Sequence, residues 1–183
     1  MRRLWIVLPL LVLAGCARPL TLHGTVIDPP RQAAPIDMTQ QDGKAFSLDA
    51  VRGVPAAVFF GFTHCKDICP QTLALLEHAR ERAGLRNDGA AIVFVSVDPK
   101  HDNAPAMRRY LQRIGVHAIG LTGTPEQVTT VERNYGVAVI SRGDDIVHGN
   151  FIYVIDRAGR LRELLHPNSQ VNEIDDDLKN LSQ

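Results

Sequence analysis

The fold is decided by residues 56–70, which read AAVFFGFTHCKDICP. Residues 56–62 are a continuous apolar run, which is typical of a strand that is buried on both faces. A second run of this kind covers residues 91–97, and residues 71–85 between the two runs carry leucine and alanine at helical spacing. We therefore predict a β-α-β unit with two parallel strands.

The rest of the chain extends this unit. A hairpin-like turn precedes it, two amphipathic helices and an antiparallel hairpin follow it, and a further helix ends the chain. Thr124, Pro125 and Gln127 have the pattern of a capping box at the start of the second amphipathic helix. This order predicts an α/β, thioredoxin-like fold, in which helices flank a central mixed sheet. The added elements are predicted at residues 36–48, 104–114, 125–134, 151–155, 161–165 and 171–181.

The composition of the 183 residues is that of an ordinary globular chain, with 45% apolar and 22% charged residues. Twenty basic and 20 acidic side chains cancel at pH 7. No overall field therefore favours nucleic acid, and we expect no nucleic-acid partner. Binding must come from a local site.

The N-terminus has the features of a bacterial export signal. Arg2 and Arg3 precede an apolar run that ends in LAGC at residues 13–16. The run is too short to span a bilayer, which takes about 20 residues. LAGC resembles the bacterial lipobox, in which the cysteine is lipidated and becomes the new N-terminus after cleavage. The alternative is an ordinary signal peptide in which Cys16 stays unmodified.

This interpretation divides the chain into three parts. Residues 1–15 are predicted to be a lipoprotein signal peptide, and residues 16–35 a lipidated N-terminus and tether with a short strand around residues 22–27. Residues 36–183 are predicted to form the thioredoxin-like domain. A lipid on Cys16 places the protein in the bacterial cell envelope, anchored to a membrane, with the domain facing the periplasm.

Cys65 and Cys69 are the cysteines that remain for the exported domain. A disulfide between them would close a very short loop and so add little stability, which favours metal or redox chemistry over a structural disulfide. We expect Pro70 at the first helical position and Cys69 at the cap. The partial positive charge of a helix N-terminus is then expected to lower the pKa of a nearby thiol.

The topology points to a third ligand for a metal. Both parallel strands end at the same edge of the sheet, at Phe62 and Val97, and the antiparallel strand near Asn150 begins at that edge. We therefore expect His148 beside the cysteine loop, although a solvated or structural histidine is the alternative. The same argument brings Asp98 to this edge.

Two thiolates and one imidazole suit either copper or zinc. His64 and His101 are further candidate ligands near the site. The remaining histidines show no spacing that converges on the cysteines, and we expect them on the surface. They are His23, His78, His117 and His166.

These residues resemble the Sco/SenC family, thioredoxin-fold copper proteins of cytochrome c oxidase assembly. The resemblance implies that Cys65, Cys69 and His148 bind copper as Cu(I), Cu(II) or both, and that the two cysteines can form a disulfide. It also implies that Asp98 acts beside the ligands or tunes their redox chemistry. The matching segments are GFTHC at 61–65, CP at 69–70, VSVDP at 95–99, GLTG at 120–123 and FIYVID at 151–156.

Three positions depart from the family pattern without removing a ligand. Lys66 stands where proline is common, His101 stands where arginine is common, and Gly149 stands where a small hydroxyl residue is common.

The resemblance favours a membrane-tethered copper metallochaperone over an enzyme. Its expected partners are the copper-centre subunit of a respiratory cytochrome c oxidase and other copper chaperones. The alternative is a thiol-disulfide reductase, in which Cys65 and Cys69 are the catalytic pair and keep the oxidase cysteines reduced. A peroxide-reducing enzyme also fits the fold, but the sequence has no clear substrate-activating arginine beside Cys65.

Overall fold

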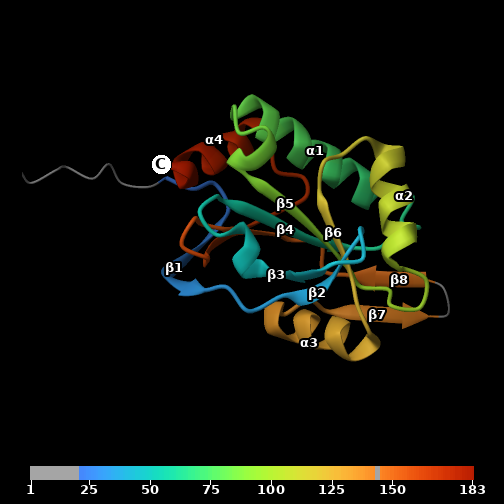
Figure 1. The fold of residues 1–183 in the computed structure, drawn as a ribbon. Helices are drawn as coiled ribbons and strands as arrows, with labels where there is room; N and C mark the ends of the chain where they lie inside the picture. Colours follow the sequence, from blue (N-terminus) through green and yellow to red (C-terminus); the bar gives the residue numbers. More distant parts are fainter. Residues whose placement is uncertain (1–20, 143–144) are drawn as a thin grey trace, which may run out of the picture.

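The computed structural model describes residues 21–142 and 145–183. Within these residues, an eight-stranded mixed sheet has the strand order β1-β10-β9-β4-β5-β6-β2-β3, and helices cover both of its faces (Figure 1). The strands of the sheet are β1 Thr25–Gln32, β2 Asp37–Gln40, β3 Ala45–Ser47, β4 Ala56–Gly61, β5 Ala91–Ser96, β6 Ile119–Thr122, β9 Ile152–Ile155 and β10 Arg160–Leu165. The α-helices are α1 Ile68–Arg82, α2 Ala104–Ile114, α3 Pro125–Tyr135 and α4 Val171–Ser182. Short 3-10 turns lie at Leu48–Val51 and Asn87–Gly89.

The predicted β-α-β unit forms the centre of the sheet. Strands β4 and β5 are parallel, with Val58 opposite Val93, and β9 runs antiparallel on the other side of β4. All residues of β4 and β9 are buried, because the sheet is covered on both faces. The thioredoxin-like mixed sheet is therefore confirmed. Its topology places the ends of β4 and β5 and the start of β9 at one edge.

Each face of the sheet has its own apolar core. On one face α1, α2 and α4 pack against the sheet, where the rings of Phe59 and Phe94 stack with centroids 6.1 Å apart. On the other face α3 contributes Tyr135, which packs edge-on against Tyr153 at 5.2 Å. Figure 1 shows these two helical layers above and below the sheet.

Helix α3 begins as the sequence predicts. The Thr124 hydroxyl accepts a hydrogen bond from the Gln127 amide, and the Gln127 side chain accepts one from the Thr124 amide. Pro125 occupies the first helical position, where its missing N–H removes no hydrogen bond.

Helix α1 begins earlier than we predicted from the sequence. Its first residue is Ile68 and Asp67 is the N-cap residue, so Cys69 lies inside the first turn and not at the cap. The helix also ends at Arg82, before the predicted end at Leu85. Pro70 is compatible with this start because the amides of the first helical turn have no partner within the helix.

The sequence interpretation did not include the hairpin of β7 Val139–Arg142 and β8 Asp145–His148. These antiparallel strands form a separate two-stranded sheet, in which Val139 lies opposite His148. Each strand has four residues, which are too few for an alternating pattern that would predict a strand. In the structure His148 is the last residue of β8, and not part of the connection into β9.

Strand β1 lies later and is longer than the strand expected around residues 22–27. It pairs antiparallel with β10 at the edge of the sheet, from Thr25 opposite Leu164 to Gln32 opposite Arg160. The register shifts between Val26 and Arg31, where the chain carries two prolines. Prolines are tolerated there because an edge strand with a bulge does not need every amide donor.

Cys16 and the signal segment at residues 1–15 lie outside the described residues. In the part of the chain that the structure describes, none of the helices has both the length and the apolar character that a bilayer crossing requires.

Candidate metal centre

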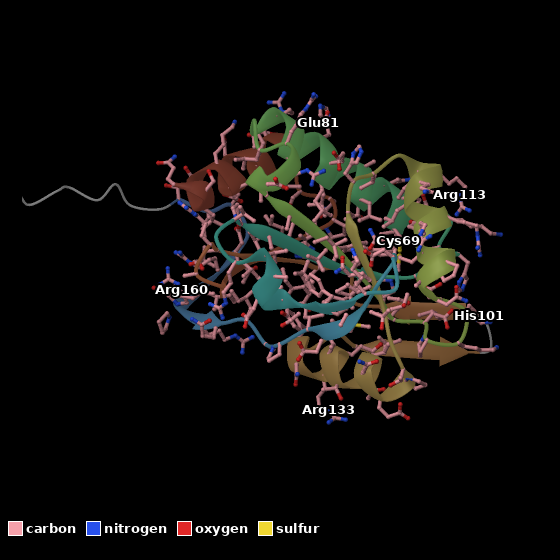
Figure 2. The ribbon with its side chains drawn as sticks, in the orientation of Figure 1. Cys69, Glu81, His101, Arg113, Arg133 and Arg160 are labelled. Carbon is pink, nitrogen blue, oxygen red and sulfur yellow. The ribbon has the colours of Figure 1, made fainter. Side chains whose placement is uncertain are left out.

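The two cysteines lie between the end of β4 and the first turn of α1. Cys69 is fully buried in the first turn of α1, whereas Cys65 is half-buried in the loop. The Cys69 amide donates a hydrogen bond to the Cys65 sulfur at 3.5 Å, so the Cys65 thiol turns back toward the helix start. Both thiols are free. Figure 2 shows Cys69 in the interior and His101 nearer the surface.

Gly61, the last residue of β4, lets the backbone pass close to the buried thiol. A Cβ atom at this position would lie 2.7 Å from the Cys69 sulfur and 2.7 Å from Cε2 of Phe94. Neither neighbour has free space to retreat into, because Cys69 and Phe94 are both fully buried. The close approach therefore requires glycine at position 61.

Burial raises the pKa of the Cys69 thiol, and the hydrogen bond with Cys65 acts in the same direction. The expected lowering of a thiol pKa at the helix start is therefore wrong for Cys69. Desolvation penalises the thiolate more than the partial charge of the helix start stabilises it. A metal ion that binds Cys69 must displace a proton.

A buried carboxylate, Asp102, fixes the start of this loop. It accepts hydrogen bonds from the Thr63 amide at 3.1 Å, from the Thr63 hydroxyl at 2.6 Å and from the Ser96 hydroxyl at 2.6 Å. Burial raises the pKa of Asp102. The sequence interpretation gave this residue no role. The available signal was that Asp102, which follows VSVDP at 95–99, also matches the family pattern.

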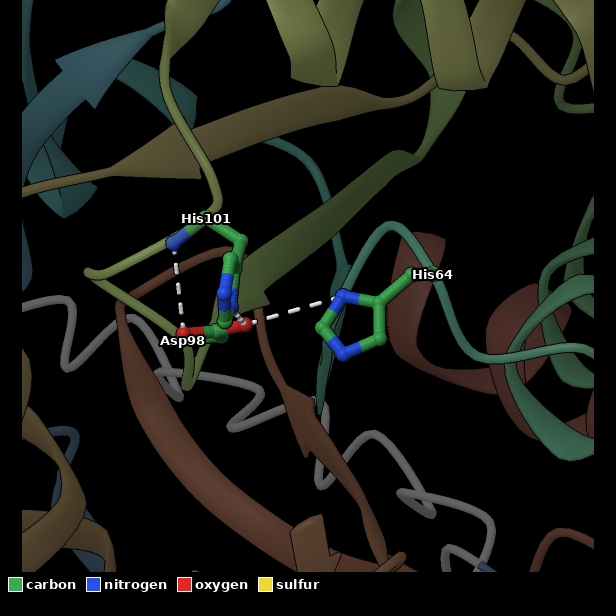
Figure 3. Close-up of side chains that lie close together, drawn as sticks. All are labelled: His64, Asp98 and His101. Carbon is green, nitrogen blue, oxygen red and sulfur yellow. Dashed lines mark hydrogen bonds and ion pairs between the residues drawn. The ribbon is translucent and has the colours of Figure 1, made fainter. Parts of the chain in front are cut away.

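Asp98 follows β5 at the predicted edge and contacts two imidazoles (Figure 3). Its Oδ2 atom lies 2.7 Å from Nδ1 of His101 and 3.6 Å from Nδ1 of His64. The two rings meet edge-on, with centroids 5.4 Å apart. Among the described residues, His64, Asp98 and His101 are the group whose ligand atoms all lie within 4.8 Å of one another.

His148 reaches the same edge from β8. Its Nδ1 lies 2.8 Å from the carbonyl oxygen of Gly149, and its ring meets the Phe62 ring edge-on at 5.8 Å. An Nδ1–H that donates to this carbonyl leaves Nε2 with the free lone pair. Burial lowers the pKa of His148, which favours the neutral imidazole that binds metals.

The three predicted ligands lie around one loop but not around one point. Phe62 contacts the rings of both His148 and His64, and it begins the loop that carries the cysteines. The ligand atoms of Cys65, Cys69 and His148 are not drawn together as closely as those of the His64 group. Two sulfurs and an imidazole nevertheless fit copper chemically, because thiolates are soft ligands and imidazole binds both oxidation states.

Known proteins resemble this chain over most of its length. The profile of the SCO1/SenC family matches residues 25–183. A SCO2-like protein of Rickettsia prowazekii is 32% identical over 153 residues, which cover 80% of this chain and 75% of that protein.

Solved structures agree with this match. The structure of Bradyrhizobium japonicum ScoI with copper bound is 32% identical, with a TM-score of 0.73 over 82% of this chain and 99% of that one. The structure of yeast Sco1 with copper bound is 25% identical, with a TM-score of 0.69 over 80% of this chain and 86% of that one. The profile match and the relatives together show that the chain belongs to the SCO1/SenC family.

Proposed function

We propose that this protein is a copper metallochaperone that helps to assemble the copper centre of a respiratory cytochrome c oxidase. In this proposal Cys65, Cys69 and His148 hold the copper ion. The observation that carries it is the pair of free thiols at the start of α1, with His148 on the neighbouring hairpin across Phe62. Copper-bound structures of two family members support the choice of metal.

Copper binding by this set requires the hairpin and the cysteine loop to approach each other. The hairpin β7–β8 forms a sheet of its own, so its end can shift without breaking a ladder of the central sheet. The half-buried Cys65 is the thiol that an incoming ion meets first. Cys69 then loses its proton as the ion binds.

A copper titration of the reduced full chain in detergent tests the ligand set. Cys16→Ser removes the third thiol, and thiolate-to-copper charge-transfer absorption reports binding. With copper added as Cu(I), we expect one ion per chain and a loss of affinity of at least about tenfold in His148→Ala. His78→Ala removes an exposed imidazole and is the control. Unchanged affinity in His148→Ala would contradict the ligand set.

The second candidate function is thiol-disulfide reduction with the same two cysteines. A half-exposed Cys65 beside a buried Cys69 matches an attacking and a resolving thiol. Thiol exchange needs no distant imidazole, so complementation of an assembly-deficient strain by His148→Ala separates the two functions. Failure at low copper with partial rescue at high copper supports the chaperone, and full rescue at low copper supports the reductase.

We also propose that a lipid on Cys16 anchors the protein in the cell envelope, with the domain in the periplasm. The motif LAGC at residues 13–16 supports this proposal. Metabolic labelling with a fatty-acid analogue tests it. We expect label on the wild-type protein and none on Cys16→Ser, and an unlabelled wild-type protein would refute the anchor.

A further inference from the structure

We propose that His64, Asp98 and His101 form a second metal site, which binds a divalent copper ion independently of the cysteines. The three side chains come from two loops that meet at the edge of the sheet (Figure 3). His64 lies in the loop after β4, Asp98 follows β5, and His101 precedes α2. Their ligand atoms all lie within 4.8 Å of one another.

The spacing of these atoms is close to that of a coordinated ion. Nitrogen and oxygen ligands lie about 2.0–2.2 Å from an ion such as zinc, so two ligands of one ion are roughly 3–4 Å apart. Asp98 Oδ2 lies 2.7 Å from His101 Nδ1 and 3.6 Å from His64 Nδ1. An ion therefore needs side-chain shifts of only about 1 Å, and it replaces the contact between Asp98 and His101.

The backbone holds the central carboxylate in place before any ion arrives. Asp98 is 4% exposed, and its Oδ1 accepts hydrogen bonds from the amides of Lys100 and His101 at 3.2 and 3.3 Å. Its Oδ2 faces the two imidazoles. The two histidine side chains are 41% and 40% exposed, so an ion from solvent can reach them.

The ligand types select the ion. Two imidazoles and one carboxylate contain no sulfur, so the set does not offer the soft ligands that Cu(I) prefers. Nitrogen and oxygen ligands bind divalent first-row ions, and affinity within that series peaks at Cu(II). The proposed site therefore differs in ligand chemistry from the cysteine pair, although His64 directly precedes Cys65.

A variant without thiols isolates this site. The full chain with Cys16→Ser, Cys65→Ser and Cys69→Ser is purified in detergent and titrated with copper(II) sulfate. Equilibrium dialysis gives the stoichiometry and affinity, and electron paramagnetic resonance detects nitrogen ligands. We expect one bound Cu(II) whose spectrum shows coupling to two nitrogens.

His101→Arg is the diagnostic change in this background. Arginine can donate hydrogen bonds to Asp98 but has no lone pair for a metal. We expect His101→Arg and His64→Ala each to weaken Cu(II) binding by at least about tenfold, with unchanged circular dichroism. His78→Ala, which removes an exposed imidazole, is the control and should bind as tightly as its parent.

Three results would overturn the proposal. The first is the absence of a bound Cu(II) ion in the thiol-free chain. The second is equal binding in His101→Arg and its parent, and the third is an equal loss in His78→Ala; either would assign the ion elsewhere. Because the cysteines are absent, none of these outcomes depends on the proposed chaperone site.

Discussion

Two of the clusters that combine imidazole with carboxylate among the described residues lie toward opposite ends of the sheet. The open cluster is His64, Asp98 and His101, at the edge where β4 and β5 end. The buried cluster is His23, Glu163 and Asp177, which joins the segment before β1 to β10 and α4. Figure 1 shows α4 and β1 on one side of the molecule and the hairpin β7–β8 on the other.

The two clusters differ in the number of buried carboxylates that they contain. Glu163 and Asp177 are both fully buried, and Asp177 accepts hydrogen bonds from the His23 amide at 3.2 Å and from the His23 ring at 2.8 Å. Glu163 accepts one from the Gly24 amide at 2.8 Å. The imidazoles are similarly exposed, at 35% for His23 and at 41% and 40% for His64 and His101, and the open cluster has one buried carboxylate, Asp98. The clusters therefore differ in their acids: two buried carboxylates join distant segments in one, and a single carboxylate faces two imidazoles in the other.

The largest expected effect is that of removing Asp177. Asp177→Ala leaves the His23 donors without their buried acceptor, and we expect it to lower the free energy of unfolding by about 3 kcal/mol in urea denaturation. Asp176→Ala, on the same helix with a side chain 55% exposed, is the control. A loss below about 1 kcal/mol would show that the buried cluster does not hold the fold together.

Asp102 tests whether the burial of a carboxylate, and not its place in the fold, determines how far its removal lowers the free energy of unfolding. Asp102 lies near the open cluster and, like Asp98, is 4% exposed. Asp102→Ala removes the acceptor for Thr63 and Ser96, and we expect a loss of about 2 kcal/mol and faster alkylation of Cys69. Asp67→Ala changes an exposed carboxylate in the cysteine loop, which Asp102 contacts, and should lower the free energy of unfolding by less than about 1 kcal/mol. Equal costs for the two variants would contradict the argument.

The buried cluster also predicts how stability depends on pH. Burial and the neighbouring Asp177 raise the pKa of Glu163 from 4.5 to about 8. Between these values the folded chain keeps a proton that the unfolded chain has lost, so the free energy of unfolding falls as the pH rises. The raised pKa of His23 acts in the same direction above pH 6.5.

Urea denaturation at several pH values between 5 and about 8 measures this slope. We expect the free energy of unfolding to fall across the window and a flatter profile in Glu163→Gln, which keeps a neutral side chain at this position. Carboxyl groups whose pKa is lowered, such as Asp156 and Asp175, titrate below the window. A rise in stability with pH, or an equal slope in Glu163→Gln, would contradict the assignment of this slope to Glu163.

The smallest expected effect is that of His101→Ala on stability. The His101 side chain is 40% exposed, so its contact with Asp98 is screened by water. We expect the free energy of unfolding to change by less than about 0.5 kcal/mol. His23→Ala is the matched imidazole change in the buried cluster. It should lower the free energy of unfolding more, because it removes the ring that contacts the fully buried Asp177. The reverse order would remove the distinction between the two clusters.

Local sequence patterns predicted much of the fold because they depend on near neighbours. The apolar runs at residues 56–62 and 91–97 predicted the central parallel strands, and the TPEQ pattern at residues 124–127 predicted the start of α3. Strand direction then placed the cysteine loop, Asp98 and the start of β9 at one edge. Periodicity, capping and connection rules need no knowledge of distant contacts.

Tertiary packing decided what these patterns could not. The raised pKa of Cys69 depends on complete burial by surrounding elements, and this burial outweighs the local helix start. His23 was expected on the surface, yet it contacts Asp177, which lies 154 positions along the chain. The contact of Asp98 with His64 likewise depends on how the loops after β4 and β5 pack together. Desolvation and side-chain approach are set by the whole fold, so a local pattern names the candidate residues and the packed structure determines which of them meet.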